Sequence, residues 1–522
     1  MNKKWLPALL QRRLVVTLLI ALQAALLIYF AISTSRVSSV LANLFAAISV
    51  IVALLVASGR GESAYKLTWV FTILCFPAVG GVLYLYFNKQ LSRTALVHRA
   101  KRASAHVAPY RYERGGACRS ELSLPPTVRY LSGFLGFPAY GEGKNTFFPS
   151  GEAMLAAMKE DLRHARRYIF MEYFIIEHGE MWDSILEILI QKAKEGVLVR
   201  VLYDDLGCFL RLPHKYRKLL KKYGIAVGKF NPFVPLFSAE QNHRDHRKIT
   251  VIDGVVAYTG GVNLADEYIG AVTRFGKWAD AAIRVEGGAA WSFTLMFLEM
   301  WMTVEKKTKE DLALFLPPHG EECDASPADE SVPTRSETKE ADAVLIPYAD
   351  SPLDDEAVGE QVYLQVIQNA KKYVYITTPY LILDDKILSA LTLAAKSGVD
   401  VRIITPHKWD KKLVHKTTRT YYSELCESGV RLYEYTPGFM HAKLVLCDDE
   451  IATVGSVNFD FRSLYLHFEC GVYLYRMQSV AAVKETFLAH LSHSEPIIAP
   501  KVRRGIFSRI YRAILRLFAP MM

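Results

Sequence analysis

The chain has 522 residues, a formal net charge of +10 and seven cysteines. The cysteines are odd in number and form no spaced framework, which argues against a disulfide-built extracellular protein and favours a reducing compartment. The positive charge suits an anionic partner, either nucleic acid or lipid, and the apolar segments described next weigh against nucleic acid.

Residues 1–100 differ in composition from the rest of the chain and predict a membrane region. Three segments, 14–35, 37–58 and 67–87, carry no charged side chain, and each is about as long as one bilayer crossing. Three such segments behind a basic start argue against a cleavable signal peptide. Proline and glycines at 77–81 predict a kink or a re-entrant turn in the third segment. If all three segments span, the Lys and Arg residues near their ends are equally numerous on the two sides of the membrane, so they do not predict an orientation. The cysteines favour a reducing compartment, and we therefore expect the rest of the chain to lie in the cytoplasm.

Residues 101–305 predict a first α/β half that ends in a hairpin of two strands. His246 and Lys248 lie two residues apart on the first strand of this hairpin, so their side chains share one face. Asp253 stands at the predicted turn, either as a turn residue or as a carboxylate that orients the histidine. Asn263 follows the return strand, where its amide could donate to a phosphate oxygen or close an Asx-turn.

Residues 343–495 repeat this pattern and predict a second half. His441, Lys443, Asp448 and Asn458 have the same spacing as the first set, and 394–403 resembles 192–201 as a helix end followed by a buried strand. Between the halves, residues 306–342 are rich in Pro, Ser, Glu, Asp and Lys and predict a disordered linker. The predicted fold class is therefore α/β, with two pseudo-symmetric halves, each a mixed sheet flanked by helices, behind N-terminal transmembrane helices.

The two histidines suit chemistry on a phosphodiester if the halves face each other. One imidazole can then attack phosphorus while the other protonates the leaving alkoxide, and the lysines offset charge on the phosphate oxygens. Each histidine needs an acceptor that fixes its tautomer, and Asp280 and Glu469, on aromatic strands downstream, are the candidates. Their alternative role is a strand-end salt bridge. This chemistry needs no metal ion or cofactor, and no segment resembles a metal site.

The repeated motif resembles that of the phospholipase D superfamily, which is His-x-Lys, four residues, Asp, six residues, Gly-Ser and then Asn. The second copy fits with Gly455-Ser456, whereas the first has Gly260-Gly261 and lacks the serine hydroxyl. Further segments that resemble the cardiolipin synthase branch are Met171-Glu-Tyr-Phe, Val201-Leu-Tyr-Asp-Asp, Thr377-Thr-Pro-Tyr and Gly455-Ser-Val-Asn-Phe-Asp-Phe-Arg-Ser. The resemblance runs from about residue 67 to about residue 495.

This resemblance implies a membrane-bound phosphatidyltransferase with two molecules of phosphatidylglycerol as substrates. By that analogy His246 attacks the first lipid and releases glycerol, His441 acts as the acid, and the second lipid displaces the phosphohistidine to form cardiolipin. A phospholipase D hydrolase, a transferase with another acceptor, and a non-catalytic membrane scaffold are the alternatives. Both His-Lys pairs are intact, which disfavours the scaffold.

Residues 496–522 predict a basic amphipathic tail. Five apolar side chains, Phe507, Ile510, Tyr511, Ile514 and Phe518, form a stripe with arginines 509, 512 and 516 on the opposite face. This pattern is typical of an interfacial helix attracted to anionic lipid. The alternative is a terminal helix that packs on its own domain.

Overall fold

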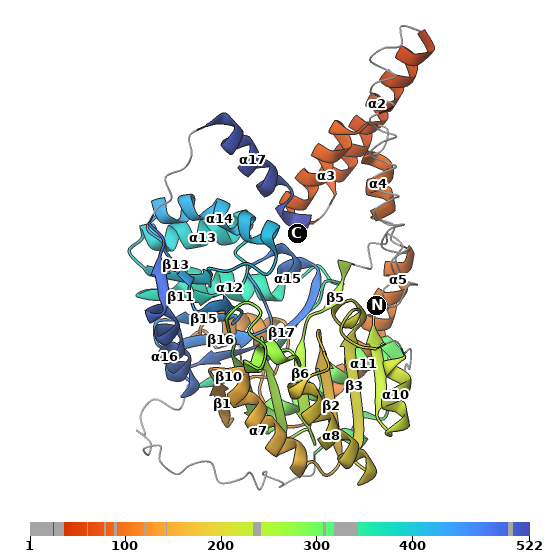
Figure 1. Cartoon of the computed structure of the whole chain (residues 1–522), viewed down its shortest axis with the longest axis vertical. Coiled ribbons are helices and arrows are strands. Elements are labelled where there is room, and N and C mark those ends of the chain that lie inside the picture. Colours follow the sequence, from red (N-terminus) through yellow and green to blue (C-terminus); the bar gives the residue numbers. More distant parts are fainter. Residues whose placement is uncertain are drawn as a thin grey trace. The chain divides into compact units, whose positions relative to one another are not determined.

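The computed structural model describes residues 25, 36–59, 61–77, 80–87, 91–119, 121–141, 143–213, 215–232, 242–305, 310–317, 343–498 and 505–521 (Figure 1). The chain divides into two compact units. The first comprises residues 1–97, 232–243 and 505–522, and the second comprises residues 98–231 and 244–504. The predicted span 14–35 lies outside the described residues, apart from residue 25.

The first unit contains the helix predicted from the second apolar segment. This helix, α2 (Arg36–Ser58), includes Ser39–Ser58, a stretch long and apolar enough to cross a bilayer and mostly exposed in the protein. Among the described residues it is the one helix that meets this test. The structure therefore supports one apolar membrane-length helix, where the sequence predicts several spans.

The third predicted span, 67–87, is divided near Pro77, where the sequence predicts a kink or a re-entrant turn. It forms α3 (Ser63–Cys75) and α4 (Gly80–Phe87), and each is too short to cross about 30 Å of hydrocarbon at 1.5 Å per residue. Pro77 lies in the break, and its carbonyl accepts a hydrogen bond from Ser49 Oγ of α2 at 2.7 Å. A Cβ at Gly80 would lie 2.7 Å from the Ile73 Cα, so only glycine permits this close turn.

The C-terminal tail forms α17 (Ile506–Leu517) followed by η7 (Ala519–Met521), and it packs on α3 within the first unit. The Thr68 hydroxyl donates to the Leu517 carbonyl at 2.6 Å, and the Phe71 and Phe518 rings meet edge to face at 6.4 Å. Phe507 and Ile510 stay exposed. One end of the helix is thus packed on its own unit, while most of the apolar stripe remains free to face lipid.

The first sheet of the second unit has the strand order β1-β9-β7-β6-β2-β3-β4. Strands β2, β3 and β4 are parallel, and the other pairs are antiparallel. The strands are β1 (Asn145–Phe148), β2 (Tyr168–Tyr173), β3 (Leu198–Asp204), β4 (Ala226–Phe230), β6 (Lys248–Ile252), β7 (Val256–Gly260) and β9 (Ala282–Glu286). The helices of this half are α7 (Gly151–His164), α8 (Glu180–Lys194), α9 (Asp205–Cys208), α10 (Tyr216–Lys222) and α11 (Gly288–Glu305). Almost every side chain of α11 is buried, as expected for a helix that is apolar all round.

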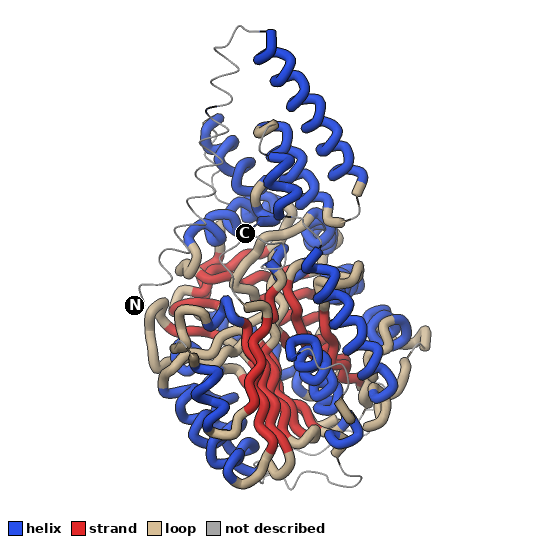
Figure 2. The backbone as a smooth tube through the Cα atoms, turned by 90° about the vertical axis from the view of Figure 1, so that its right-hand side faces the viewer, coloured by secondary structure: helices blue, strands red, loops and turns tan. Residues whose placement is uncertain are grey.

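The second sheet repeats this arrangement with the order β10-β17-β16-β15-β11-β12-β13-β18. Its strands are β10 (Val344–Asp350), β11 (Tyr373–Thr377), β12 (Asp400–Pro406), β13 (Arg431–Tyr435), β15 (Leu444–Cys447), β16 (Ile451–Gly455), β17 (His467–Tyr475) and β18 (Ser494–Pro496). Its helices are α12 (Val358–Asn369), α13 (Asp385–Lys396), α14 (Lys412–Glu427), α15 (Phe461–Tyr465) and α16 (Ser479–Ser492). Figure 2 shows the strands with helices around them. The predicted pair of mixed sheets flanked by helices is confirmed.

The two halves exchange short strands at the positions that precede the two histidines. Strand β5 (Arg244–Asp245) of the first half pairs in parallel with the start of β17, at His467 and Phe468. Strand β14 (Gly438–Met440) of the second half pairs in the same way with β8 (Lys277–Ala279). These reciprocal pairings hold each histidine-bearing segment against the other half, in agreement with the predicted pseudo-symmetry.

The linker predicted over residues 306–342 is wrong for residues 310–317. There Leu312 and Phe315 are buried in the short helix η5 (Leu312–Phe315), and the Phe315 ring packs on Tyr168 and Phe170. Glu310 forms an ion pair of 2.6 Å with Arg200. The apolar run Leu-Ala-Leu-Phe explains the difference, since it can bury enough surface to become ordered. The remainder of the predicted linker lies outside the described residues.

The connecting elements of the second unit are short. They are η1 (Ala108–Tyr110), α6 (Pro126–Val128), η2 (Arg129–Phe134) and η4 (Asp266–Ile269), and α5 (Leu91–Val107) leads from one unit into the next.

Candidate active site

His246 and His441 occupy matching positions between an exchanged strand and a hairpin strand. The His246 backbone N–H donates to the Phe468 carbonyl at 2.9 Å, and that of His441 donates to the Ala279 carbonyl at 2.7 Å. Both side chains are buried. Each histidine is thus fixed by the backbone of the opposite half.

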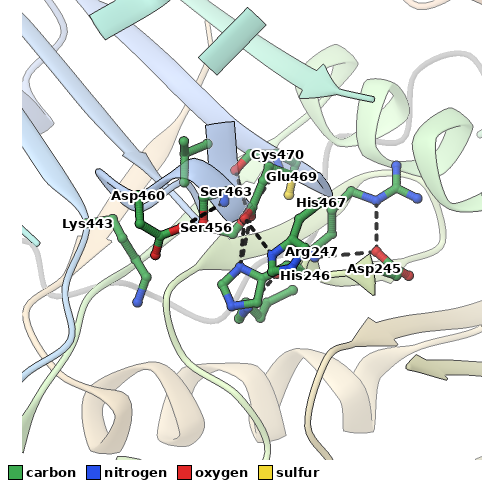
Figure 3. A network of polar contacts seen from close by, with 12 residues as sticks. Asp245, His246, Arg247, Lys443, Ser456, Asp460, Ser463, His467, Glu469 and Cys470 are labelled. Atoms are coloured by element: carbon green, nitrogen blue, oxygen red, sulfur yellow. Dashed lines mark hydrogen bonds and ion pairs between the residues drawn. The ribbon is translucent and has the colours of Figure 1, made fainter. Parts of the chain in front are cut away.

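The two predicted carboxylates hydrogen-bond to the histidines in a crossed arrangement, and Figure 3 shows the contact between His246 and Glu469. His246 Nδ1 lies 2.9 and 3.0 Å from the two Glu469 carboxylate oxygens, and His441 Nδ1 lies 2.6 Å from Asp280 Oδ2. A carboxylate on Nδ1 leaves Nε2 of the same ring for the substrate. Because each carboxylate comes from the other half, neither half contains a complete histidine pair by itself.

The motif lysines are buried beside their histidines. Lys248 Nζ donates to the His246 carbonyl, and Lys443 Nζ donates to the His441 carbonyl and lies 3.2 Å from His441 Nε2. Burial lowers the pKa of Lys248 to about 8 and that of Lys443 to about 7. An arriving phosphate anion would favour their charged forms.

The charges of both half-sites act on the histidines. Burial and Lys248 hold the pKa of His246 well below its ordinary value, and His467, Lys443 and His441 add to this effect. Burial and Lys443 lower the pKa of His441 to about 4. Both imidazoles are therefore neutral at pH 7 without substrate, and the mutual effects place the two half-sites in one site.

The two carboxylates differ in charge state. Burial raises the pKa of Glu469 from 4.5 to about 8. Burial also acts to raise the pKa of Asp280, but His441 and Lys443 outweigh it and the net shift is downward. Asp280 is thus the firmly ionised partner, which favours a positive charge on His441 when the substrate arrives.

The Ser/Gly difference between the two motifs is coupled to this Glu/Asp difference. The Ser456 hydroxyl donates to Glu469 Oε2 and accepts from the Cys470 N–H at 3.1 Å (Figure 3). In the first half, a Cβ at Gly261 would lie 2.1 Å from Asp280 Oδ1. The shorter aspartate therefore occupies the space that a serine side chain would need. The Gly261 N–H donates to the Ala281 carbonyl at 3.0 Å, so this amide is already used.

Asp253 and Asp448, which the sequence places among the catalytic residues, make structural contacts at the turns of the two hairpins. Both have left-handed backbone conformations, with φ of 53° and 54°. Asp253 accepts from three successive backbone N–H groups, 166–168, at 2.7 to 2.8 Å, and Asp448 accepts from those of 371–373 at 2.6 to 2.8 Å. Lys248 begins β6 and Asp253 follows its last residue, so the two are about 16 Å apart along the strand at a rise of about 3.3 Å per residue. These contacts favour the turn alternative for both, and a catalytic role for either stays a prediction.

The two motif asparagines have different surroundings. Asn263 Oδ1 accepts from the Ile175 N–H at 3.0 Å, and its Nδ2 donates to the Tyr268 hydroxyl at 2.7 Å. The Tyr268 ring in turn meets His441 at 5.5 Å, so Asn263 supports the site through Tyr268, and the predicted direct phosphate contact is not what this geometry favours. Asn458 is buried, and its Oδ1 has no hydrogen-bond partner among the described residues.

Sequence reasoning missed one residue in each half that lies against the histidines. His467 and Trp278 occupy equivalent places, two residues before Glu469 and Asp280. The His467 ring lies 5.5 Å from that of His246, and Trp278 lies 5.2 Å from His441 and 4.7 Å from Phe439. The signal was available, since residues i and i+2 of a strand share a face. One half-site is therefore bordered by a polar ring and the other by aromatic rings.

His246, His467 and Glu469 also place three potential metal ligands within 4.8 Å of one another. Lys248 adjoins this group, and its charged form opposes a cation there. The expectation that no metal is needed stays a prediction, which chelation tests.

The chain matches two protein families along its length. The family described as "Cardiolipin synthase, PLD-like domain" matches residues 158–272 and 363–491, one segment in each half. The family described as "Phospholipase_D-nuclease N-terminal" matches residues 41–87, which include most of α2 and all of α3 and α4.

Curated relatives cover most of the chain. An uncharacterized protein of Streptococcus mutans is 41% identical over 461 residues, covering 87% of this chain and 96% of that protein. A cardiolipin synthase of Halalkalibacterium halodurans is 35% identical over 467 residues, covering 87% of this chain and 88% of that protein. Among solved structures, a phosphatidylserine synthase of Haemophilus influenzae shares the fold, with a TM-score of 0.55 and 16% sequence identity. The match covers 76% of this chain and 98% of that structure's chain.

The doubled sheet, the paired His-x-Lys motifs and these matches define a phospholipase D superfamily protein. Within that superfamily the chain belongs to the cardiolipin synthase-like family.

Proposed function

We propose that the protein is a cardiolipin synthase, which transfers a phosphatidyl group from one phosphatidylglycerol to another and releases glycerol. The observation that carries this proposal is the crossed pairing of His246 with Glu469 and of His441 with Asp280, in a chain that is 35% identical to a named cardiolipin synthase. The membrane-length helix α2 supports a location at the cell membrane, where the substrates are.

In the first step, the neutral His246 attacks phosphorus through Nε2. The bond from phosphorus to the glycerol oxygen breaks, and His441 gives its Nε2 proton to that oxygen, so glycerol leaves and a phosphatidyl-histidine remains. His441 is neutral without substrate, so it takes up this Nε2 proton from solvent when the phosphodiester anion binds, because the anion and the ionised Asp280 both favour the protonated imidazole. Lys248 and Lys443 offset charge on the non-bridging oxygens.

In the second step, His441 acts as a base. Its Nε2 takes the proton from a hydroxyl of the second phosphatidylglycerol, the resulting oxygen attacks phosphorus, and the bond to His246 Nε2 breaks. Cardiolipin is formed and both imidazoles return to their starting states. Water in place of the second lipid would give phosphatidic acid.

The test is to incubate the purified protein in micelles with labelled phosphatidylglycerol and a chelator, and to identify the products by mass. We expect cardiolipin and glycerol in equal amounts. Phosphatidic acid alone would indicate a hydrolase, another lipid product in the presence of added alcohols would indicate a different acceptor, and no product would favour a scaffold.

His246→Ala and His441→Ala distinguish the two roles. We expect each to lower turnover by about 10³-fold or more, since each removes either the nucleophile or the general acid. After denaturation with detergent at mildly alkaline pH, which preserves the bond between phosphorus and the imidazole nitrogen, labelled lipid bound covalently to the protein should be found in the wild type and be absent from His246→Ala. Substantial turnover in either variant would contradict the two-histidine mechanism.

A further inference from the structure

Two loops of the second unit expose apolar side chains at equivalent places. They follow β3 and β12, two strands of seven residues each, and they comprise residues 205–213 and 407–413. In the first loop Leu206 is 40% exposed and Leu210 is 85% exposed, and in the second Trp409 is 48% exposed and Leu413 is 53% exposed. Isolated exposed leucines are ordinary, but paired clusters on two related loops mark a contact surface.

The first loop packs directly on the surroundings of His246. A Cβ at Gly207 would lie 2.1 Å from the Phe174 carbonyl oxygen, so the loop backbone approaches Phe174 closely. The Phe174 ring lies 5.0 Å from that of His246. The backbone of this loop at Gly207 is thus two contacts away from the proposed nucleophile.

The second loop adjoins the same site from the other half. The Tyr380 hydroxyl donates to Asp410 at 2.5 Å, and Lys411 Nζ lies 4.9 Å from the centre of the Tyr380 ring. The charge of Lys411 acts on His467, which borders His246. Because both loops leave the carboxyl ends of parallel strands, they lie where α/β sheets bind ligands.

The charges of the second loop indicate the chemistry of the partner. Lys408, Lys411 and Lys412 accompany the exposed Trp409 and Leu413, with Asp410 as the acidic residue among them. Lys412 Nζ lies 5.9 Å from the centre of the Trp409 ring. Basic side chains beside a half-exposed tryptophan are typical of surfaces that dock at the headgroup level of an anionic bilayer.

We propose that these two loops form a lipid-docking rim, which seats the catalytic unit on the surface of a bilayer that contains anionic phospholipid. Leu206, Leu210, Trp409 and Leu413 enter the interface, and the lysines meet the headgroups. The scissile phosphodiester can then reach His246 while its acyl chains remain in the bilayer, which avoids exposing them to water. The inference rests on the proposed function, because it assumes that the substrate is a membrane phospholipid.

The first experiment compares two forms of the substrate with the full-length protein. Leu210→Ala and the double variant Trp409→Ala/Leu413→Ala are assayed on phosphatidylglycerol vesicles and on monomeric short-chain phosphatidylglycerol. We expect turnover on vesicles to fall about tenfold, because less apolar surface enters the bilayer, and turnover on the monomeric lipid to stay within about twofold of wild type.

Leu393→Ala is the matched control. Leu393 is 66% exposed and lies near the end of α13, the helix that leads into the start of β12, so it is at the opposite edge of the sheet from Trp409. We expect this variant to match wild type on both substrates. An equal fall on both substrates in the rim variants, or no fall on either, would overturn the proposal.

A second measurement separates the rim from the proposed function. The protein is reconstituted into bilayers with phospholipid brominated on the acyl chains, and tryptophan fluorescence quenching is compared between wild type and Trp409→Phe. A quenched component that disappears in the variant supports docking even if no cardiolipin is formed. An unquenched Trp409 overturns the rim, whether or not the wild type transfers lipid.

Discussion

At the scale of single residues, the two half-sites reach the same hydrogen bond by different means. Ser456 orients a longer glutamate, whereas Gly261 leaves room for a shorter aspartate. The Gly-Gly departure from the family motif is therefore compensated within the site, because the carboxylate and the small residue change together. The aspartate half-site is the one with the firmly ionised carboxylate.

This pairing predicts that Gly261→Ser will displace Asp280. The new Cβ would lie 2.1 Å from Asp280 Oδ1, so we expect the carboxylate to leave His441 and kcat to fall about 100-fold, as for loss of a well-placed acid. Ser456→Gly should lower kcat only about tenfold, since Glu469 keeps its hydrogen bond with His246.

The decisive control for this prediction is the double variant Gly261→Ser/Asp280→Glu, which rebuilds the pairing of the second half in the first. Its kcat in phosphatidylglycerol micelles should exceed that of Gly261→Ser alone, because the longer carboxylate can accept from the new hydroxyl. If the double variant were no faster than the single one, the two positions would not be coupled.

Glu469 gives the stability of the protein a specific pH dependence. Its folded-state pKa of about 8 lies above its ordinary value of 4.5, so the folded protein holds this proton more tightly than the unfolded chain. The resulting stabilisation is complete below about pH 4.5 and is lost as the pH rises to about 8. Glu469→Gln removes this titration. The measurement is the difference in Tm between the wild type and this variant in detergent. We expect the Tm of the wild type to fall relative to that of the variant as the pH rises from 5 to 8. A difference that does not change with pH would contradict the raised pKa of Glu469.

At the scale of elements, the motif aspartates join each hairpin to the strand beside it. Asp253 accepts from the backbone at the start of β2, and Asp448 does the same at the start of β11. We expect Asp253→Ala or Asp448→Ala to lower the free energy of unfolding by about 1–3 kcal/mol, since backbone donors lose their acceptor.

The rates of these aspartate variants separate a structural role from a catalytic one. At a temperature well below Tm, kcat should remain within about twofold of wild type, because the turn is about 16 Å from the lysine of its strand. Asp253→Asn should be milder, since asparagine tolerates the left-handed backbone and keeps one acceptor oxygen. A kcat loss without a stability loss would restore these residues to the catalytic set.

The hairpins, the duplicated strands and the His-Lys faces could be predicted from the sequence because they depend on short-range spacing. The crossed partners could not, since Glu469 meets His246 across 223 residues through the pairing of β5 with β17. Alternation along a strand says which side chains share a face, but not which strand of the other half lies opposite. His467 and Trp278, by contrast, could have been found by this alternation, since each lies two residues before a candidate carboxylate on the same strand.

At the scale of the whole molecule, apolar length alone does not show whether a segment crosses the membrane as one helix. Residues 67–87 are uncharged throughout, yet the break at Pro77 and the close approach at Gly80 divide them into two helices that pack with α2. Hydropathy measures the preference for lipid along a segment and does not measure whether the segment runs straight. Conversely, the charged composition of 306–342 concealed the apolar run at 312–315 that packs into the core.

The tail and α2 differ in how they can hold the protein to the membrane, and this difference is measurable. Helix α2 contains 20 residues with a mean hydropathy of 2.7, which anchors irrespective of salt. We expect the exposed stripe of α17, backed by arginines 509, 512 and 516, to bind anionic lipid at the surface, and salt should screen this attraction. A chain without residues 505–522 should therefore stay in the membrane fraction after high-salt and alkaline washes. The turnover of this truncated chain on vesicles should fall only severalfold. Substitution of the three arginines by glutamine should lower turnover to the same extent at low salt and leave it unchanged at high salt. Release of the truncated chain into the soluble fraction would show that α2 does not span the bilayer and that the tail is the principal anchor.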